Sequence, residues 1–262
     1  MTTIEPTRAL PERAHRPGFR SWVRLCVCEA KMTARDTAGL VIPFGLPLLI
    51  LLMSASGAGT EVVVADRTVL DLYVLPLVCV MIATMIGVVN MPSFLAYYRR
   101  SGVLKRLATT PLSPFMVLAV QVAVSFVQAV IGIGIAYGVA SAVFGANPPH
   151  RIAAAIGVLL ATMLAMYALG MVVASISPTP NSAVAIGLIG FLGLGALGGM
   201  FGPRDALPEA ITRIGDALPF GAGVDALGAA WAGQPIEASN LMTLAVTVVI
   251  GAVVAALCFR WE

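Results

Sequence analysis

Residues 72–98 read LYVLPLVCVMIATMIGVVNMPSFLAYY, a run of 27 residues without a charged side chain. About 20 apolar residues in a helix cross the roughly 30 Å hydrocarbon core of a bilayer, so this run is long enough to span a membrane. The whole chain has 262 residues, of which 59% are hydrophobic and only 11% are charged. Soluble proteins carry about 25% charged residues. The composition therefore excludes an ordinary soluble enzyme, a nucleic-acid-binding module and a disordered chain, and it indicates an integral membrane protein.

The other uncharged intervals predict five more spans. Span one lies within residues 37–60, span three covers 114–144, and span six covers 238–259. The interval 152–203 is too long for one crossing, and the turn-forming residues at 177–182 divide it into spans four and five. The predicted fold is all-α, with six transmembrane helices.

Lys and Arg are unevenly divided between the two sides of this arrangement. Six spans place both termini on one side, which carries seven cations in residues 1–37, four in residues 99–114, and Arg260. The opposite side carries the remaining four of the 16. Because cytoplasmic loops carry the excess of Lys and Arg, the sequence predicts a multi-pass cell-membrane protein with both termini in the cytoplasm.

The segment before the first span has the period of an amphipathic helix. Its apolar face contains Phe19, Trp22, Val23, Cys26 and Val27. Arg20, Arg24 and Lys31 lie on the other side, and such a basic helix favours the membrane interface, as a functional element or only as an anchor. We expect residues 1–36 to form a cytoplasmic segment with this interfacial helix, followed by a six-helix membrane domain at 37–262.

The connection between spans two and three is both basic and apolar. Val103, Leu104 and Leu107 follow helical spacing. Lys105 and Arg106 stay on the polar side, and positive-inside anchoring alone would account for these cations. A short amphipathic helix of this kind also suits docking into a cleft on a soluble partner.

The connection before the last span, residues 202–240, is hydrophobic for a loop. This favours one or two short helices that return into the outer leaflet, broken at Pro219 and Gly221, over a loosely packed loop. In span five, the spacing of Gly195 and Gly199 permits close helix approach. That approach is either a contact with a second protomer or internal packing.

The predicted spans lack the residues of several membrane chemistries. No apolar centre contains an ionisable side chain of the kind that marks proton paths. The sequence also lacks a Gly-rich phosphate loop with Lys and Ser or Thr, and its four scattered cysteines do not form a metal or disulfide pattern. We expect a chain that is not an enzyme alone and binds no metal or cofactor, so that any work is driven by another polypeptide.

Residues 100–113, RSGVLKRLATTPLS, are similar to the basic segment between spans two and three of ABC-2-type ABC transporter permeases. The sequence resembles in particular the daunorubicin/doxorubicin-resistance permeases. Residues 200–208 and 218–227 are similar to the family's outer re-entrant region, and the helix ahead of span one adds to the resemblance. The family often carries Glu near positions 97–100, where this chain has Tyr and Arg.

The resemblance implies export of a hydrophobic or amphiphilic drug, lipid or related metabolite. Two permease protomers, of the same chain or a paralogue, would lie in the lipid bilayer above two copies of an ABC ATPase subunit that holds ATP and Mg, with no nucleic acid involved. The implied ATPase-coupling residues are Arg100, Gly102, Leu104, Lys105, Arg106, Leu107, Thr110 and Pro111. The implied re-entrant gate contains Pro203, Leu207, Pro208, Leu218, Pro219, Phe220 and Gly221. A proton-coupled secondary transporter and a membrane anchor for a soluble partner are the alternatives.

Overall fold

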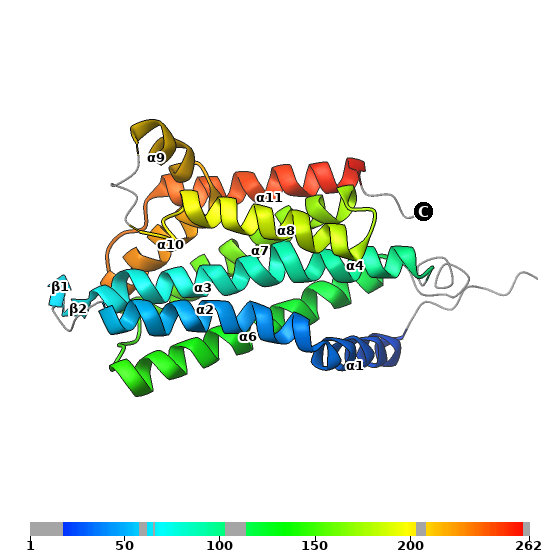
Figure 1. The fold of residues 1–262 in the computed structure, drawn as a ribbon, viewed down its shortest axis with the longest axis horizontal. Helices are drawn as coiled ribbons and strands as arrows, with labels where there is room; N and C mark the ends of the chain where they lie inside the picture. Colours follow the sequence, from blue (N-terminus) through cyan, green and yellow to red (C-terminus); the bar gives the residue numbers. More distant parts are fainter. Residues whose placement is uncertain (1–17, 58–61, 65, 103–113, 203–207, 259–262) are drawn as a thin grey trace, which may run out of the picture.

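A computed structural model describes residues 18–57, 62–64, 66–102, 114–202 and 208–258 of the chain. The described part is almost entirely helical, and six of its helices are long and apolar enough to cross a membrane. The spans lie side by side along the long axis of the molecule (Figure 1). The predicted number and positions of the spans are therefore confirmed.

Five of the spans are single helices. They are α2 (Thr37–Gly57), α6 (Pro114–Phe144), α7 (Ile152–Ile176), α8 (Pro180–Leu197) and α11 (Ala238–Cys258). The remaining span, Leu70–Arg100, is called span two here. Its consecutive parts are the π-helical segment η1 (Leu70–Val74), α3 (Leu75–Thr84), the π-helical segment η2 (Met85–Asn90) and α4 (Met91–Arg100).

Span two is the central helix of the bundle. Its most apolar window is 89% buried, compared with 17% to 44% for the other five spans. Two glycines allow neighbouring helices to reach its backbone: a Cβ on Gly170 of α7 would lie 2.9 Å from the carbonyl carbon of Gly87, and a Cβ on Gly187 of α8 would lie 2.9 Å from the Cα of Val89. Such contacts need residues without a side chain, so α7 and α8 pack directly on η2.

The turn between α7 and α8 explains why the long apolar interval breaks where the sequence predicts. Thr179 is the N-cap of α8, and its hydroxyl accepts a hydrogen bond from the Ser182 backbone N–H at 3.1 Å. Pro180 occupies the first position of the helix, where its missing N–H is not needed. Only three residues, 177–179, therefore separate α7 from α8.

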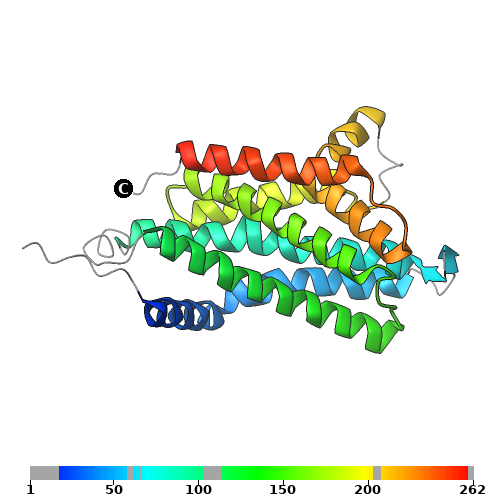
Figure 2. The same ribbon diagram turned by 180° about the vertical axis from the view of Figure 1, so that it is seen from behind.

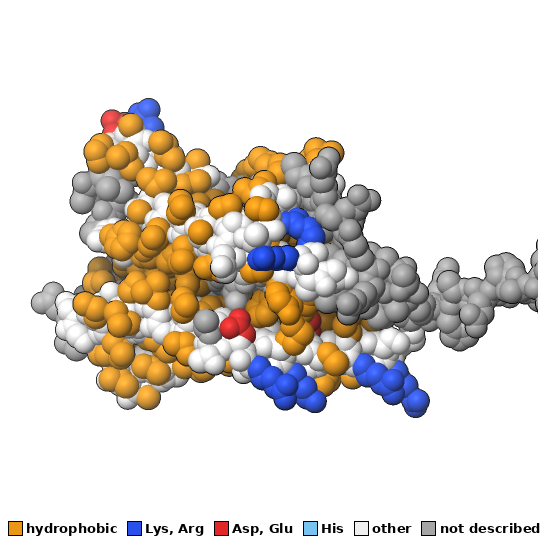
Figure 3. Space-filling model, turned by 45° about the vertical axis from the view of Figure 1, so that its right-hand side comes forward, with side chains coloured by type: hydrophobic (Ala, Val, Ile, Leu, Met, Phe, Trp, Pro, Cys, Tyr) orange, Lys and Arg blue, Asp and Glu red, His pale blue; other side chains and the backbone are white. Residues whose placement is uncertain are grey.

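The two ends of the bundle differ in composition. One end, called the α1 end, carries helix α1 (Phe19–Arg35), the end of α4 and the α7–α8 turn (Figure 1). The other, called the hairpin end, carries the short antiparallel strands β1 (Val62–Val64) and β2 (Arg67–Thr68) and the helices α9 and α10. Hydrophobic side chains cover the spans, and blue Lys and Arg side chains gather over α1 (Figure 3). The hairpin is a small addition to the predicted all-α fold.

The hydrophobic connection before the last span forms two helices, α9 (Glu209–Asp216) and α10 (Pro219–Ala232). The expected break at Pro219 is correct in position, because this proline begins α10. The expected break at Gly221 is wrong, since Gly221 lies buried inside the first turn of α10. The start of α10 packs closely on the end of α8, where a Cβ on Gly198 would lie 3.0 Å from the Gly221 nitrogen, and this tertiary packing outweighs the low helix propensity of glycine.

Candidate functional site

A groove runs over span two between α2 and α8 and opens at the α1 end. Its wider part is a cavity of about 400 Å³, called the lower cavity. The lower cavity is lined by Met32, Arg35, Asp36, Ser93, Phe94, Tyr97 and Pro180. It therefore combines one cation, one carboxylate and a hydroxyl with apolar and aromatic side chains.

The groove continues deeper into the bundle as an upper cavity of about 150 Å³, which shares Asp36 and Ser93 with the lower cavity. Apolar side chains form most of its walls: Ile42, Pro43, Met85, Val89, Val184 and Leu188. The floor is η2, and Asn90 adds a polar amide at the point where the two cavities meet. The polarity of the groove thus falls from the α1 end toward the middle of the bundle.

Three helices are tied together beside the upper cavity by buried amides. Asn90 donates to the Gly39 carbonyl at 3.1 Å and to the Gln128 side-chain oxygen at 3.2 Å, and Gln128 donates to the same carbonyl at 2.9 Å. A Cβ on Gly39 would lie 2.9 Å from the Asn90 side-chain oxygen, so glycine is required there. This cluster fixes α2 and α6 against η2, because buried polar groups are stable only when they are hydrogen-bonded.

The groove does not continue to the hairpin end. Phe191 of α8 and Phe220 of α10 are fully buried, and Met200 is 7% exposed, in one apolar cluster with Met85 of η2. Large side chains therefore fill the space between α8, α10 and span two beyond the upper cavity. The groove is open at the α1 end and along its side, where Ile42 and Val184 are exposed, and it ends at these large side chains toward the hairpin end.

Glu29 and Tyr98 link α1 to the end of span two. The Tyr98 hydroxyl donates to Oε2 of Glu29 at 2.5 Å, and Glu29 is only 4% exposed. Burial raises the pKa of the Glu29 carboxyl, and the hydrogen bond from Tyr98 lowers it by a smaller amount. Its Oε1 has no hydrogen-bond partner among the residues that the structure describes. A carboxyl is thus held near positions 97–100, where the sequence itself has no acid.

Glu29 was missed as a site residue although the sequence contains a signal for it. It follows Trp22 by seven residues and Cys26 by three, so it falls on the same side of the helix as these partly apolar positions. An acid on that face of an amphipathic helix must find a partner or point into the membrane interface. The partner, Tyr98, is 69 positions away in the chain and is not visible from local spacing.

Arg99 joins the end of span two to the α7–α8 turn. Its guanidinium donates to the Ser177 carbonyl. This contact is possible because α7 packs beside α4. Together with the Glu29–Tyr98 contact, this places α1, α4 and the α7–α8 turn in one connected unit at the α1 end.

The predicted coupling residues fall at the edge of the described chain. Arg100 is the last residue of α4, and Gly102 follows with a φ of +69°, a left-handed conformation that suits glycine after a helix end. Six lie outside the described residues: Leu104, Lys105, Arg106, Leu107, Thr110 and Pro111. The described part therefore shows only where this segment starts, directly after the connected unit.

The predicted face of the interfacial helix is divided in the structure. Trp22 and Cys26 are half-buried on the side that packs against α6, whereas Phe19, Val23 and Val27 are exposed. The helix itself, α1, continues beyond these residues to Arg35. Some apolar side chains of α1 thus pack against the bundle, and the others stay exposed.

The predicted gate and glycine positions lie at the hairpin end. Pro203 and Leu207 are outside the described residues, Pro208 is the N-cap of α9, and Leu218 is the N-cap of α10. Pro219 and Phe220 are buried at the start of α10. In span five, a Cβ on Gly195 would lie 2.9 Å from the Met200 sulfur of the same chain, and Gly199 lies beyond the end of α8. The contact between protomers at this pair stays a prediction.

A hydrogen-bond network closes the hairpin end. Asp71, fully buried at the start of span two, accepts hydrogen bonds from the backbone N–H and side-chain amide of Asn147 at 2.8 and 3.1 Å. It also accepts from the backbone and hydroxyl of Thr68, each at 3.3 Å. The Trp231 indole of α10 donates to the Asn147 carbonyl at 3.2 Å. This end joins β2, span two, the α6–α7 loop and α10.

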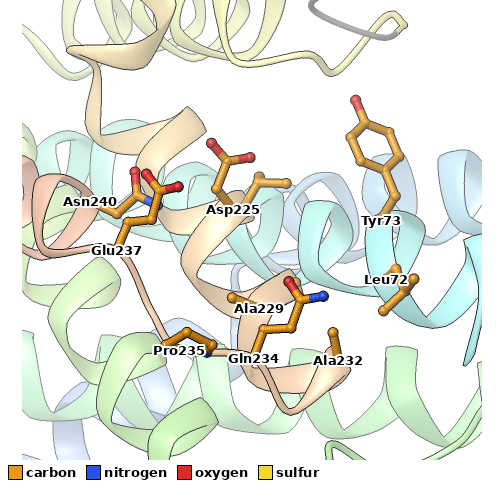
Figure 4. Close-up of a pocket in the computed structure, with 11 residues that line it drawn as sticks. Leu72, Tyr73, Asp225, Ala229, Ala232, Gln234, Pro235, Glu237 and Asn240 are labelled. Atoms are coloured by element: carbon orange, nitrogen blue, oxygen red, sulfur yellow. The ribbon is translucent and has the colours of Figure 1, made fainter. Parts of the chain in front are cut away.

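A separate cavity of about 410 Å³ lies beside this network, between η1, α10 and the start of α11. Figure 4 shows Asp225 and Glu237 on the same side of it, and Leu72 and Tyr73 on the η1 side. The Tyr73 hydroxyl donates to the Gly199 carbonyl. The cavity at the hairpin end is therefore acidic, in contrast to the cationic α1 end.

No group of three or more His, Cys, Asp or Glu residues suited to hold a metal ion occurs in the described part of the chain. The groove combines carboxylate, guanidinium and hydroxyl groups with apolar side chains.

Residues 22–230 match the family model described as ABC-2 type transporter. The chain belongs to this family. The match runs from α1 through nearly all of α10 and so includes the groove, the connected unit and the closed hairpin end. No curated protein matches the sequence.

Membership in the ABC-2 family defines the role of the chain in general terms. It is a multi-pass membrane permease domain, the non-catalytic transmembrane part of an ABC transporter. Such a permease works with an ATPase subunit, which binds the ATP, and holds no cofactor itself.

Proposed function

We propose that this chain is an export permease that moves a hydrophobic or amphiphilic compound, such as a drug or lipid, out of the cytoplasm through the α2–α8 groove. The observation that carries the proposal is the shape of the groove, which is open at the α1 end and closed by Phe191, Met200 and Phe220 toward the hairpin end. Since exporters load on the cytoplasmic side, this shape corresponds to a loading state with the α1 end in the cytoplasm. The excess of Lys and Arg on that side supports this orientation, with both termini cytoplasmic.

The lining of the groove supports an amphiphilic cargo. An apolar body would lie in the upper cavity, against Ile42, Val184 and Leu188, and a polar group would lie in the lower cavity near Arg35 and Asp36. Apolar pockets with a few placed polar groups bind ligands of this type. Drug export of the daunorubicin/doxorubicin kind falls within this class.

The connected unit at the α1 end would pass the motion of the ATPase to the groove. The coupling segment starts at Arg100. The preceding residue, Arg99, contacts the α7–α8 turn, and Tyr98 just before it contacts α1. A push on this segment therefore acts on both walls of the lower cavity, because α1 leads into α2 and the turn leads into α8. In this proposal residues 1–36 are the interfacial segment and 37–262 the transport domain.

A second protomer, of the same chain or a paralogue, would complete the path. The side of α8 that faces away from its own bundle exposes Ile189 and Leu192, and a Cβ on Gly193 would meet nothing within 4 Å. Apolar residues beside a glycine suit close helix packing in membranes. Span five is therefore the proposed contact through this exposed face. The predicted pair Gly195 and Gly199 lies at its end and is buried within the single protomer. The two ATPase copies would lie below, and α9 and α10 would form the outer re-entrant gate.

The coupling assignment is tested by reversing charge at Lys105 and Arg106. In membranes that hold the permease with its ATPase, the double variant Lys105→Glu with Arg106→Glu is expected to lose co-purification of the ATPase and export of a fluorescent amphiphile such as doxorubicin. Arg213→Glu, an exposed cation on α9 at the hairpin end, is the matched control and should keep both. ATPase binding that persists in the double variant would remove the coupling role of this segment.

A further inference from the structure

Helix α1 carries three distinct stripes. With 3.6 residues per turn, Trp22, Leu25, Glu29 and Thr33 fall on the inner side that packs against the bundle. Phe19, Val23, Val27, Ala30 and Ala34 form an exposed apolar stripe beside it. Arg20, Arg24, Lys31 and Arg35 form an exposed cationic stripe next to the apolar one.

The direction of α1 places these stripes at the boundary of the membrane. Figure 1 shows the spans lying in the plane of the page and the turns of α1 closely overlapped, so α1 is inclined to the direction of the spans. A helix that crosses the spans at their end lies along the membrane surface, with its apolar stripe toward the hydrocarbon and its cations at the level of the phosphates. Figure 3 shows Lys and Arg side chains over α1 beside hydrophobic ones.

A cavity of about 170 Å³ fills the angle between α1, α2 and α6, and is called the elbow cavity here. It is lined by Ala30, Thr33, Ala34, Leu40, Phe44, Val124, Val127, Gln128 and Ile131. Most of these side chains are apolar, and Val127 and Ile131 are exposed on the outer surface of α6. The elbow cavity is separate from the α2–α8 groove, with which it shares no lining residue.

Thr33 gives the elbow cavity an unsatisfied polar group. It is 5% exposed, and its hydroxyl has no hydrogen-bond partner among the described residues. A buried hydroxyl without a partner is costly, and in hydrocarbon no water is available to satisfy it. The other polar residue of the lining, Gln128, already donates to the Gly39 carbonyl. A molecule in the cavity that offers an acceptor would satisfy the Thr33 hydroxyl.

We infer that the elbow cavity and the cationic stripe together bind an anionic glycerophospholipid from the leaflet at the α1 end. An acyl chain lies in the cavity against Phe44 and Ile131, and the Thr33 hydroxyl donates to an ester carbonyl. The phosphate and its anionic headgroup lie at the cationic stripe, near Arg24 and Lys31. A glycerophospholipid suits the site because it combines an acyl chain for the cavity, an ester carbonyl for the Thr33 hydroxyl and a negative charge for the cations of α1.

This lipid site does not rest on the proposed transport function. It requires only that the chain is embedded in a membrane, which its family and its six spans establish. Failure of export or of ATPase coupling would leave it unaffected. Loss of the lipid site would in turn leave the α2–α8 groove in place.

Native mass spectrometry of the full-length permease, extracted with equal amounts of phosphatidylglycerol and phosphatidylcholine of identical acyl chains, tests the site. The wild-type protein is expected to retain phosphatidylglycerol preferentially. The double variant Arg24→Gln with Lys31→Gln should lower that preference about tenfold, because interfacial cations attract anionic lipids. The control Arg151→Gln with Arg213→Gln removes two cations at the hairpin end and should keep the preference.

Two further variants separate the hydroxyl from the charges. Thr33→Val keeps the shape and should lower retention of both lipids equally, because an ester carbonyl is common to them. Ala34→Phe fills the cavity and should do the same. The inference would be overturned if the α1 double variant kept its lipid preference, or if the hairpin-end control lost it equally. Full lipid retention in Thr33→Val would also overturn it, as would displacement of the lipid by glycerol phosphate alone.

Discussion

The buried carboxyls at the two ends of the bundle, Asp71 at the hairpin end and Glu29 at the α1 end, differ in how completely they are hydrogen-bonded. At the hairpin end, Asp71 accepts four hydrogen bonds from Thr68 and Asn147, and Trp231 extends the network to α10. At the α1 end, Glu29 has one partner for two buried oxygens, and the hydroxyl of Thr33 has none in the described structure. A satisfied network stabilises one arrangement, whereas an unsatisfied one leaves room for a ligand or a second state. In this structure the hairpin end is thus held in one closed arrangement, whereas the α1 end leaves room for a ligand.

The largest effect on stability is expected at the contact of α7 with span two, because both helices run through the bundle from one end to the other. Gly170→Leu should prevent folding or lower the free energy of unfolding by about 3 kcal/mol or more, because its side chain would enter the backbone at Gly87. Gly157→Leu, on the same helix with nothing within 4 Å of its Cβ position, is the control. Thermal unfolding in detergent measures both. Equal stability of the two variants would contradict the close packing of α7 on η2.

At the hairpin end, Asp71→Asn should lower stability by about 1–3 kcal/mol, since its new amide would face the Asn147 donors and leave buried groups unpaired. The exposed acid Glu209 provides the control Glu209→Gln, with an expected change close to zero. Denaturant unfolding is the measurement. A loss no larger than in the control would mean that the Asp71 network does not hold this end closed.

At the α1 end, a smaller and pH-dependent effect is expected from Glu29→Gln. Burial raises the pKa of Glu29 above its ordinary value of 4.5, so the protonated form is favoured in the folded protein. Its stabilising contribution is complete below pH 4.5 and is lost as the pH rises through the raised pKa of the folded state. Wild-type Tm should therefore fall over this window, and Glu29→Gln should remove that part of the fall. Parallel pH profiles of the two proteins would contradict the burial of this carboxyl.

The spans were predictable because each is a long apolar interval bounded by charge or by proline-rich turns, as at Ser177–Ser182. The close packing of span two was not, since Gly87 and Gly170 carry no mark that distinguishes them from the other glycines of the membrane helices. The hydrophobic segment after Gly202 predicted the short helices α9 and α10, but the fit of Phe220 and Gly221 against α8 depends on tertiary contact.

The groove was beyond sequence reasoning because its lining comes from four separate helices. Asp36 and Ser93 lie far apart in the chain and meet only once α2 packs on span two. Asn90 and Gln128 lie within apolar intervals, which the sequence identifies only as membrane spans. Both amides donate to the same backbone carbonyl, that of Gly39, and a backbone partner leaves no pattern in the sequence. The distribution of Lys and Arg predicted the cationic side of the protein, but it could not predict the cavity that opens there.

Spin-label distances across the groove test the central claim most directly, with the native cysteines replaced. Labels at Ile42→Cys and Leu188→Cys mark the two walls of the upper cavity, and an excess of unlabelled chain restricts the measurement to distances within one protomer. In complex with the ATPase, we expect a long distance between the labels without nucleotide and a distance shorter by several ångströms when ATP is trapped. The same distance in both states would contradict a groove that loads at the α1 end and closes under the action of the ATPase.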